Sequence, residues 1–462
     1  MLEGTNGRRY LGLDDEPQGT RDPLLKDDNV VESYTRLESS PDTTSDEESL
    51  HAYDEKKESW NNPRENIAKL LITFFGFTLM GLTDAAIGAL LPSLEEHYDI
   101  DDVQVSFALL VPVCGFLLST VVCTWSHYKL GRGGVSILGI CCQLSNYCVA
   151  MSNPPYWALL TFFAIGGLGS GLMNGSWNAW VGAFNDSHSV LGVLQGFYAL
   201  GGILGPAIFT WLISHNMIWY TYYRMLALFA FILLIAAIVV FHKDGPTAYI
   251  SKLEEDDEKG SQKENSSGSS ATIEALKTRE VWLLSLLLYS YQGTEMSLSD
   301  WVVTYMIRVR NGDPRYMGLI SSCLWTGLTA GRIGLGFVTG RFKNHKRVVT
   351  VYLLCAIVSQ LIFWGSSDLI MSAVSILFVG FFTGPIFPSA MILTTNILPK
   401  RLHVPGICAS TGLSGVGSAT FPVMIGALLD RLGAKVLQPV LCFFLFVLTG
   451  LWIALPSKRR IS

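Results

Sequence analysis

The sequence predicts an all-α polytopic membrane protein with twelve transmembrane helices arranged as two six-helix halves. Half of the 462 residues are hydrophobic and only 15% are charged, whereas a soluble domain carries about a quarter charged residues. Apolar runs of about 20 residues, the length that crosses a bilayer, recur about twelve times. A hydrophilic stretch at 243–280 has six of these runs before it and six after it.

Each predicted span is an apolar run bounded by polar or basic residues. In chain order the spans are 67–91, 104–125, 134–151, 156–182, 190–214, 221–242, 281–307, 316–340, 348–366, 370–398, 404–429 and 436–456. The chain then divides into a tail (1–66), an N-terminal half (67–242), a central loop (243–280), a C-terminal half (281–457) and a short basic tail (458–462).

Charge is concentrated outside the spans. The tail at 1–66 has 17 acidic and 8 basic side chains, and its polar composition predicts disorder. We expect the same of most of 243–272. Outside 1–66 and the central loop 243–280, the chain holds only 12 acidic and 19 basic side chains, which argues against a soluble multidomain enzyme. It also argues against a nucleic-acid partner, because such a partner requires a strongly basic surface.

The distribution of lysine and arginine predicts that both termini are cytosolic. In this orientation the loops after the second, eighth and tenth spans face the cytosol and carry Lys129, Arg132, Arg341, Lys343, Lys346, Arg347, Lys400 and Arg401. The protein is then an integral, monomeric component of the lipid bilayer. An Asp-Pro-Leu-Leu run at 22–25 is similar to endosomal sorting signals, so plasma membrane and vacuolar or endosomal membrane both stay open.

No catalytic or cofactor motif is recognisable. The nine cysteines lie in or beside apolar runs and are interpreted as packing residues. There is no phosphate-binding G-x-x-x-x-G-K-[ST] loop and no H-E-x-x-H metal motif. We therefore expect no enzyme activity, no cofactor and no metal.

Two carboxylates within spans are the leading functional candidates. Asp84 lies in the first span and Glu295 in the seventh. An ionised carboxylate in the bilayer is unfavourable unless it faces a cavity or has a partner. Both residues are therefore predicted to couple protons or to bind a ligand. Arg332, in contrast, is expected to extend toward the membrane surface or to cap helix ends.

Polar residues in three other places suggest a site for an uncharged polyhydroxyl ligand. Asn174 and Asn178 are four residues apart, on one face of the fourth span. The fifth span adds Gln195 and Tyr198, and the seventh adds Gln292 and Trp301. Amides both donate and accept hydrogen bonds, and aromatic rings can stack on a sugar ring.

An internal repeat relates the two halves. Thr83-Asp84 aligns with Thr294-Glu295, and the fourth and tenth spans share a G-x-x-x-G pattern at 167–171 and 380–384. Parallel repeats of six helices are typical of a large class of transporters in which the solute site lies between the halves, near the bilayer midplane.

These motifs resemble the major facilitator superfamily, and within it a fungal fucose permease-like branch. The run T-D-A-A-I-G-A-L-L-P at 83–92 is similar to that branch's first-span motif, and Asp84 falls on its functional aspartate. The run Y-Q-G-T-E-M-S-L-S-D-W at 291–301 is similar to its seventh-span signature, which adds Tyr291 to the candidate site. The resemblance implies alternating access, a sugar-like solute and proton coupling. Bacterial proton-coupled members carry a glutamate where this chain has Asn174, so either Glu295 couples protons or transport is facilitative.

The sequence predicts a secondary active or facilitative transporter of a small polar, sugar-like solute, with protons as an optional second partner. Two alternatives stay open. One is an exporter of amphipathic metabolites or drugs. The other is a nutrient sensor that does not transport and signals through its acidic tail.

Overall fold

Helices account for almost all of the described chain. The structure, a computed structural model, describes residues 58–100, 102–251, 268–312 and 314–456, which belong to one compact unit. Most of the tail that is predicted to be disordered, the segment 252–267 of the central loop and the basic tail 458–462 lie outside the described residues.

The first half is built from five long helices. These are α3 (Glu65–Tyr98), α4 (Asp102–Ala150), α5 (Tyr156–Gly182), α6 (Ser187–Ser214) and α7 (Tyr220–Val240). With 49 residues, α4 is long enough to cross a bilayer twice. It changes direction at Gly131, whose φ of 69° is accessible to glycine without strain. The predicted second and third spans therefore form one helix with a sharp break.

The second half repeats this arrangement with more interruptions. A short helix α9 (Gly268–Lys277) precedes α10 (Arg279–Arg310), α11 (Pro314–Gly340) and α12 (His345–Gly365). The tenth predicted span is divided into α13 (Leu369–Thr383) and α14 (Ile386–Ile397). The last two spans are α15 (His403–Leu432) and α16 (Leu437–Ala454), each preceded by a 3₁₀ turn.

The described helices account for twelve crossings. Nine helical segments in this part of the chain are long and apolar enough to cross a membrane, and the one at Phe107–Ala150 spans 44 residues, enough for two. More polar but equally long, α10 and α11 contain 32 and 27 residues. The all-α polytopic fold class is confirmed.

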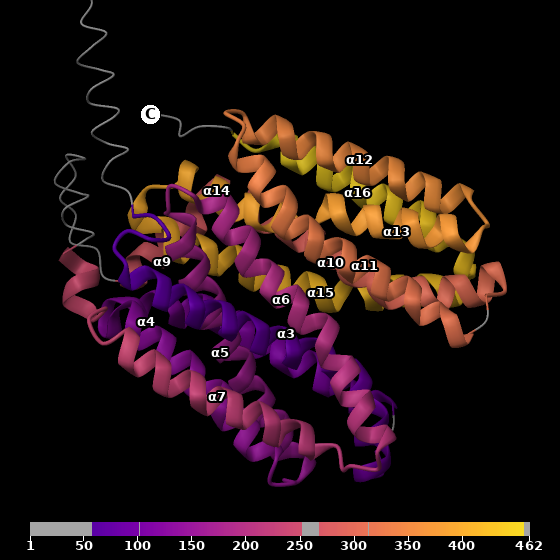
Figure 1. Cartoon of the computed structure of the whole chain (residues 1–462), viewed down its shortest axis with the longest axis horizontal. Helices are drawn as coiled ribbons and strands as arrows, with labels where there is room; N and C mark the ends of the chain where they lie inside the picture. Colours follow the sequence, from indigo (N-terminus) through magenta and orange to yellow (C-terminus); the bar gives the residue numbers. More distant parts are fainter. Residues whose placement is uncertain (1–57, 101, 252–267, 313, 457–462) are drawn as a thin grey trace, which may run out of the picture. The chain divides into compact units, whose positions relative to one another are not determined.

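The two halves use equivalent glycines in equivalent ways. A Cβ on Gly167 of α5 would lie 2.0 Å from the carbonyl oxygen of Pro112 in α4. A Cβ on Gly380 of α13 would lie 2.3 Å from the carbonyl oxygen of Leu324 in α11. In each half the fourth span therefore touches the second span through a glycine, as the shared G-x-x-x-G pattern indicates. Figure 1 shows the halves as separate groups of helices, indigo to magenta and orange to yellow.

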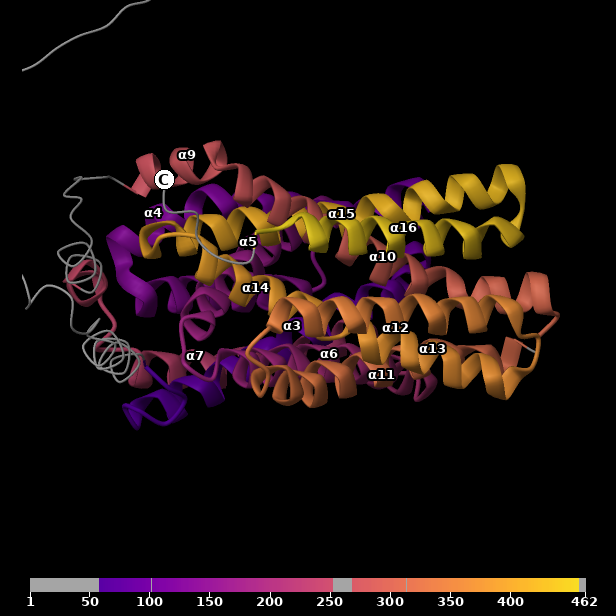
Figure 2. The same cartoon turned by 90° about the horizontal axis from the view of Figure 1, so that it is seen from above.

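Short turns between successive crossings define two ends of the bundle. The tail end is marked by residues 58–66 and α9, at the left in Figures 1 and 2. The open end is marked by the turns at 151–155, 215–219 and 366–368. Between the halves, α6 packs along α11 and α4 packs along α15.

The sequence predicts that most of 243–272 is disordered, but the end of the central loop folds as the helix α9. Ala271 and Ala275 of α9, four residues apart, are fully buried in an apolar cluster with Val281, Leu398, Leu402 and Ala409. Glu274 of α9 also forms an ion pair with Arg401 at 2.5 Å. A short amphipathic helix surrounded by serines has little signal in composition, so the sequence analysis missed it.

An ion-pair network ties the first half together at the tail end. Asp244, just after α7, accepts hydrogen bonds from Lys69 Nζ at 2.8 Å and from Arg132 Nε at 2.9 Å. Burial alone would raise the pKa of Asp244, but the nearby charge of Arg132 and the hydrogen bonds from both cations outweigh it, so this pKa is lowered. The network therefore joins α3, α4 and the end of α7.

Candidate functional site

A cavity of about 1050 Å³ lies between the two halves. The first half lines it mainly with α3, α4, α5 and α6, together with Tyr223 of α7, and the second half lines it mainly with α10, α11 and α15, together with Phe387 of α14. On α3, α6, α10 and α15, all of which run from the tail end to the open end, the lining residues fall in the middle and later parts: 80–88, 195–210, 292–300 and 414–423. The cavity therefore extends from the middle of the bundle toward the open end.

At the tail end the halves are in direct contact. A Cβ on Gly192 of α6 would lie 2.3 Å from the Arg332 carbonyl oxygen and 3.3 Å from the Cα of Gly336, both on α11. Thr395 Oγ1 donates to the Gly182 carbonyl at 3.0 Å. These contacts bring backbones of the two halves together, so the bundle is closed at the tail end.

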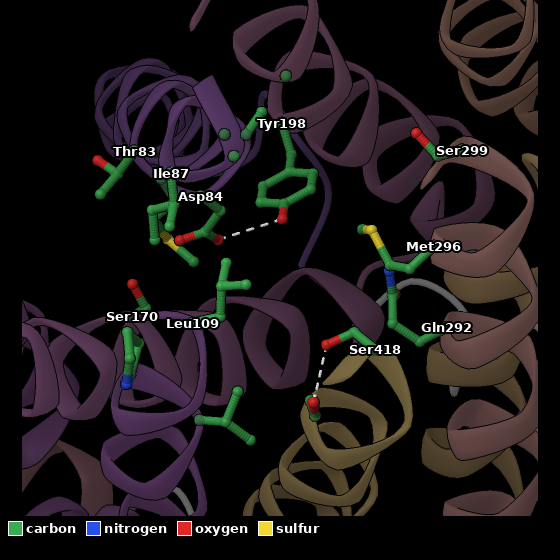
Figure 3. A pocket seen from close by; sticks show the side chains of 18 of the residues that line it. Thr83, Asp84, Ile87, Leu109, Ser170, Tyr198, Gln292, Met296, Ser299 and Ser418 are labelled. Carbon is green, nitrogen blue, oxygen red and sulfur yellow. Dashed lines mark hydrogen bonds between the residues drawn. The ribbon is translucent and has the colours of Figure 1, made fainter. Parts of the chain in front are cut away.

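Asp84 projects from α3 into the cavity. Its carboxylate accepts a hydrogen bond from the Tyr198 hydroxyl of α6 at 3.1 Å (Figure 3). Among the described residues it forms no ion pair. A carboxylate held by a single neutral donor and facing a cavity is able to exchange a proton or to bind a solute.

Glu295 has a different environment from its repeat partner Asp84. Its two carboxylate oxygens lie 2.9 and 3.0 Å from Arg332 Nη2, and both side chains are only 2% exposed. Arg332 also donates to the Tyr291 hydroxyl and to the Gln195 carbonyl, each at 3.4 Å. The expectation that Arg332 extends toward the surface is wrong, because a buried carboxylate on α10 holds its guanidinium inside the bundle.

A chain of amides joins α5 to α6 beside the cavity. Asn178 Nδ2 donates to both the backbone and the side-chain oxygens of Asn174 at 2.8 Å. Gln195 Nε2 donates to Asn178 Oδ1 at 3.1 Å. Asn174 and Gln195 line the cavity, whereas Asn178 is completely buried behind them. The spacing of the two asparagines predicted their proximity, but only one of them faces the cavity.

The remaining predicted residues divide between the cavity and its surroundings. Tyr198 and Gln292 line the cavity, and Figure 3 shows them on opposite sides of it. Tyr291 is 1% exposed and lies beside the Glu295–Arg332 pair, outside the lining. Trp301 is also outside the lining, and its indole N–H donates to the carbonyl of Pro422, a lining residue, at 3.0 Å. The structure thus brings Asp84, Asn174, Gln195, Tyr198 and Gln292 to one cavity.

Several lining residues were not singled out as site residues from the sequence. Gln143 and Asn146 come from the second part of α4, and Ser170 comes from α5. Asp300 lines the cavity from α10, although its position near the end of the span led us to expect a structural role. Two amides three residues apart within an apolar run, as in Q-L-S-N, would have been a usable signal for the first pair.

The electrostatic character of the lining is acidic. Its charged residues are Asp84, Asp300 and Arg332, and Arg332 is already neutralised by Glu295. Among the described residues there is no group of three or more His, Cys, Asp or Glu side chains that could hold a metal ion. The site is therefore a cavity with polar and acidic groups set among apolar side chains, and its described lining residues include no unpaired cation.

The described helices make twelve crossings in two repeated halves. A cavity lined in part by polar groups lies between the halves and reaches one end of the bundle. This arrangement defines a membrane transporter. The family model of the Major Facilitator Superfamily matches residues 73–422, and the chain belongs to this superfamily. The resemblance inferred from the sequence motifs is confirmed at this level.

The chain also resembles individual proteins, at low sequence identity. The chain is 27% identical over 403 residues to "Bypass of stop codon protein 6" of Saccharomyces cerevisiae, covering 82% of this chain and 81% of that protein. It is 22% identical over 330 residues to the glucose/mannose transporter GlcP of Bacillus subtilis, covering 70% and 79%. Its fold is similar to that of a variant of the Escherichia coli fucose:proton symporter FucP, with a TM-score of 0.61 and 14% identity over 86% of this chain and 99% of that chain.

Proposed function

We propose that the protein is a secondary transporter of a small, polar, sugar-like solute and works by alternating access. The observation that carries this proposal is the cavity, which is lined by amide, hydroxyl and carboxylate groups from both halves and is closed at the tail end. The names of two similar proteins, a glucose/mannose transporter and a fucose:proton symporter, support a sugar-like solute.

Solute binding would use the polar side chains that line the cavity. Asn174, Gln195 and Tyr198 present hydrogen-bonding groups from the first half, and Gln292 presents an amide from the second. Asn178 holds Asn174 and Gln195 in place. Tyr291 would act as a positioning residue through Arg332. Nothing in the contacts of Trp301 supports a binding role for it.

Proton coupling would depend first on Asp84. This carboxylate faces the cavity and has the Tyr198 hydroxyl as its hydrogen-bond donor, so protons can reach it from the open end. Glu295 is enclosed by Arg332 instead, and its protonation would first require that ion pair to separate. In this proposal Asp84 exchanges the transported proton, and the pair of Glu295 and Arg332 responds to the change of state.

By the positive-inside rule the tail end would face the cytosol. The basic loops gather at that end, and the structure then corresponds to an outward-open state. A monomer in the plasma membrane or in a vacuolar or endosomal membrane is consistent with this orientation.

The test is uptake of radiolabelled hexoses into proteoliposomes, with and without an inward proton gradient. Saturable uptake that the gradient accelerates, and that Asp84→Asn makes insensitive to the gradient, would support a proton symporter. Saturable uptake that ignores the gradient would support facilitated diffusion. No saturable hexose uptake by the purified protein would contradict the sugar-like solute.

Export of an amphipathic compound is the second candidate function. One observation favours it: Phe116, Phe163, Trp325 and Phe387 line the same cavity as the polar groups. Aromatic rings of this kind bind the apolar face of an amphipathic molecule. Efflux of a fluorescent amphipathic dye from loaded proteoliposomes, measured beside hexose uptake, separates the two functions.

A further inference from the structure

A second group of polar side chains lines the first half's side of the cavity. Gln143 and Asn146 are three residues apart on α4 and therefore share one face of the helix. Both line the cavity, as does Ser170 of α5. None of the three belongs to the amide chain that Asn174, Asn178 and Gln195 form.

These two amides are buried, and their hydrogen bonding is incomplete. Gln143 is 2% exposed; its amide N–H donates to the Ser170 hydroxyl, but its Oε1 has no partner among the described residues. Asn146 is 3% exposed, and its Oδ1 also has no partner there. Buried polar atoms of folded proteins are nearly always hydrogen-bonded, so each exception requires an explanation.

The neighbouring groups indicate what chemistry would complete these bonds. Ser170 accepts from Gln143, which leaves its hydroxyl proton available for a ligand. Thr83 is already hydrogen-bonded to the Tyr147 hydroxyl at 2.5 Å. Figure 3 shows Thr83, Asp84 and Ser170 on one side of the cavity, with Gln292, Met296 and Ser299 across from them. The available groups are thus acceptors and donors side by side: two amide oxygens and the Asp84 carboxylate accept, whereas the Asn146 amide N–H groups and the Ser170 hydroxyl donate.

A ligand for these groups must both donate and accept hydrogen bonds at neighbouring atoms, as adjacent hydroxyl groups do. It must also lack a negative charge, because Asp84 lies nearby and the one cation in the lining, Arg332, is paired with Glu295. A neutral polyhydroxyl compound meets both conditions. A sugar acid does not, because its carboxylate would lie near the Asp84 carboxylate, and Arg332 is already paired with Glu295.

We propose that Gln143, Asn146 and Ser170, together with Asp84, form a solute-binding subsite that binds neighbouring hydroxyl groups of an uncharged polyol. The proposal rests on the proposed transport function and narrows its substrate class. It assigns the polar end of the solute to the first half, with the amides of α4 as residues that determine specificity against anions.

Two substitutions test the subsite, and a third serves as a matched control. Asn146→Leu and Gln143→Met preserve side-chain size while removing the amide. Gln360→Met makes the same change in α12, where Gln360 Oε1 is also buried and has no partner among the described residues, and the amide N–H donates to Gln438. Gln360 lies outside the cavity lining.

Binding of D-glucose, D-mannose, L-fucose, D-xylose, myo-inositol and D-glucuronate is measured as ligand-induced thermal stabilisation of the purified protein, and uptake is measured in proteoliposomes. We expect at least one neutral compound to stabilise the wild type and glucuronate not to. Asn146→Leu and Gln143→Met should weaken that binding about tenfold, as the loss of one hydrogen bond does, whereas Gln360→Met should leave it unchanged. The ligand-free Tm of Asn146→Leu should stay at the wild-type value or rise.

Four results would separate the proposals. Unchanged sugar binding in both α4 variants, with a lowered ligand-free Tm, would show that the amides are structural and would overturn the subsite. Binding of glucuronate as tight as that of glucose would overturn it too. Binding of neutral sugars without uptake would contradict the transport function and leave the subsite standing. No binding of any compound to the wild type would overturn both.

Discussion

Glu295 and Arg332 form an ion pair that is buried in the second half and reaches the first. The carboxylate of α10 contacts one guanidinium nitrogen through both of its oxygens, and the same guanidinium contacts the Gln195 carbonyl of α6. The ion pair therefore connects the two halves of the protein near the closed end of the cavity. Asp84, which aligns with Glu295 in the internal repeat, has no ion-pair partner among the described residues.

Breaking this ion pair on one side should destabilise the protein strongly. We expect Glu295→Gln to lower the free energy of unfolding by about 3–5 kcal/mol, because Arg332 is left charged and unpaired in the interior. The double variant Glu295→Leu/Arg332→Met should recover most of this loss, since no charge is then buried. Thermal unfolding of the purified protein, followed by tryptophan fluorescence, measures both. A single variant as stable as the wild type would contradict the pairing.

Closure of the tail end should be sensitive to any side chain at Gly192. We expect Gly192→Leu to keep α6 away from α11, because the new Cβ would lie 2.3 Å from the Arg332 carbonyl. The cavity should then become accessible from the tail end. Labelling of Ser418→Cys in a cysteine-free background, with an impermeant maleimide added to each side of the membrane, measures this access. Gly334→Leu is the control, since its Cβ would meet nothing within 4 Å.

The network around Asp244 should make stability depend on pH. The pKa of Asp244 is lower in the folded protein than its ordinary value of about 3.9. The unfolded chain therefore takes up the proton first as the pH falls, and the stabilisation that is complete at neutral pH is lost below about pH 4. We expect Asp244→Asn to cost about 3 kcal/mol at pH 7, where Lys69 and Arg132 would be left without their carboxylate.

The difference in Tm between Asp244→Asn and the wild type, measured from pH 7 down to pH 3, tests this prediction. The difference should shrink as the pH falls. Glu65→Gln is the control, because the Lys243–Glu65 ion pair is more than half exposed and should contribute little at any pH. A difference that stays constant with pH would contradict the assignment.

A large side chain at Gly88 should block the cavity without harming the fold. Gly88 lines the cavity, and a Cβ there would meet nothing within 4 Å. We expect Gly88→Trp to reduce the uptake rate about tenfold or more while leaving the Tm within a few degrees of the wild type. Gly365→Trp, at the end of α12, provides a control with equally open surroundings. Normal uptake by Gly88→Trp would place the solute path elsewhere.

Sequence patterns could predict the crossings and part of the site. Apolar length alone located the twelve spans, because the bilayer sets a minimum length that few other structures share. The position of Asp84 in the cavity could also be predicted, because an ionisable group within a span must face a cavity or have a partner inside the bundle. The i,i+4 spacing correctly joined Asn174 to Asn178.

Relationships between helices could not be predicted in this way. Nothing in the spacing of Glu295 and Arg332, 37 residues apart on different helices, shows that they meet. The position of Trp301 beside Pro422 depends on how α10 is rotated against α15. Likewise, the sequence places Asn174 and Asn178 on one face but does not say which of them borders the cavity. Each of these facts depends on helix packing, which is set by many side chains at once.

The division of the tenth span gives the second half a joint that the first half lacks. In the first half α5 runs without interruption for 27 residues, whereas its counterpart is divided between Thr383 and Ile386, at a Gly-Pro step. A continuous helix tilts as one rigid body, whereas two segments joined at a proline can change direction independently. Phe387, just past the joint, borders the cavity. The tail end can thus open by bending of α14 alone, which would separate Thr395 from Gly182 without tilting the whole half.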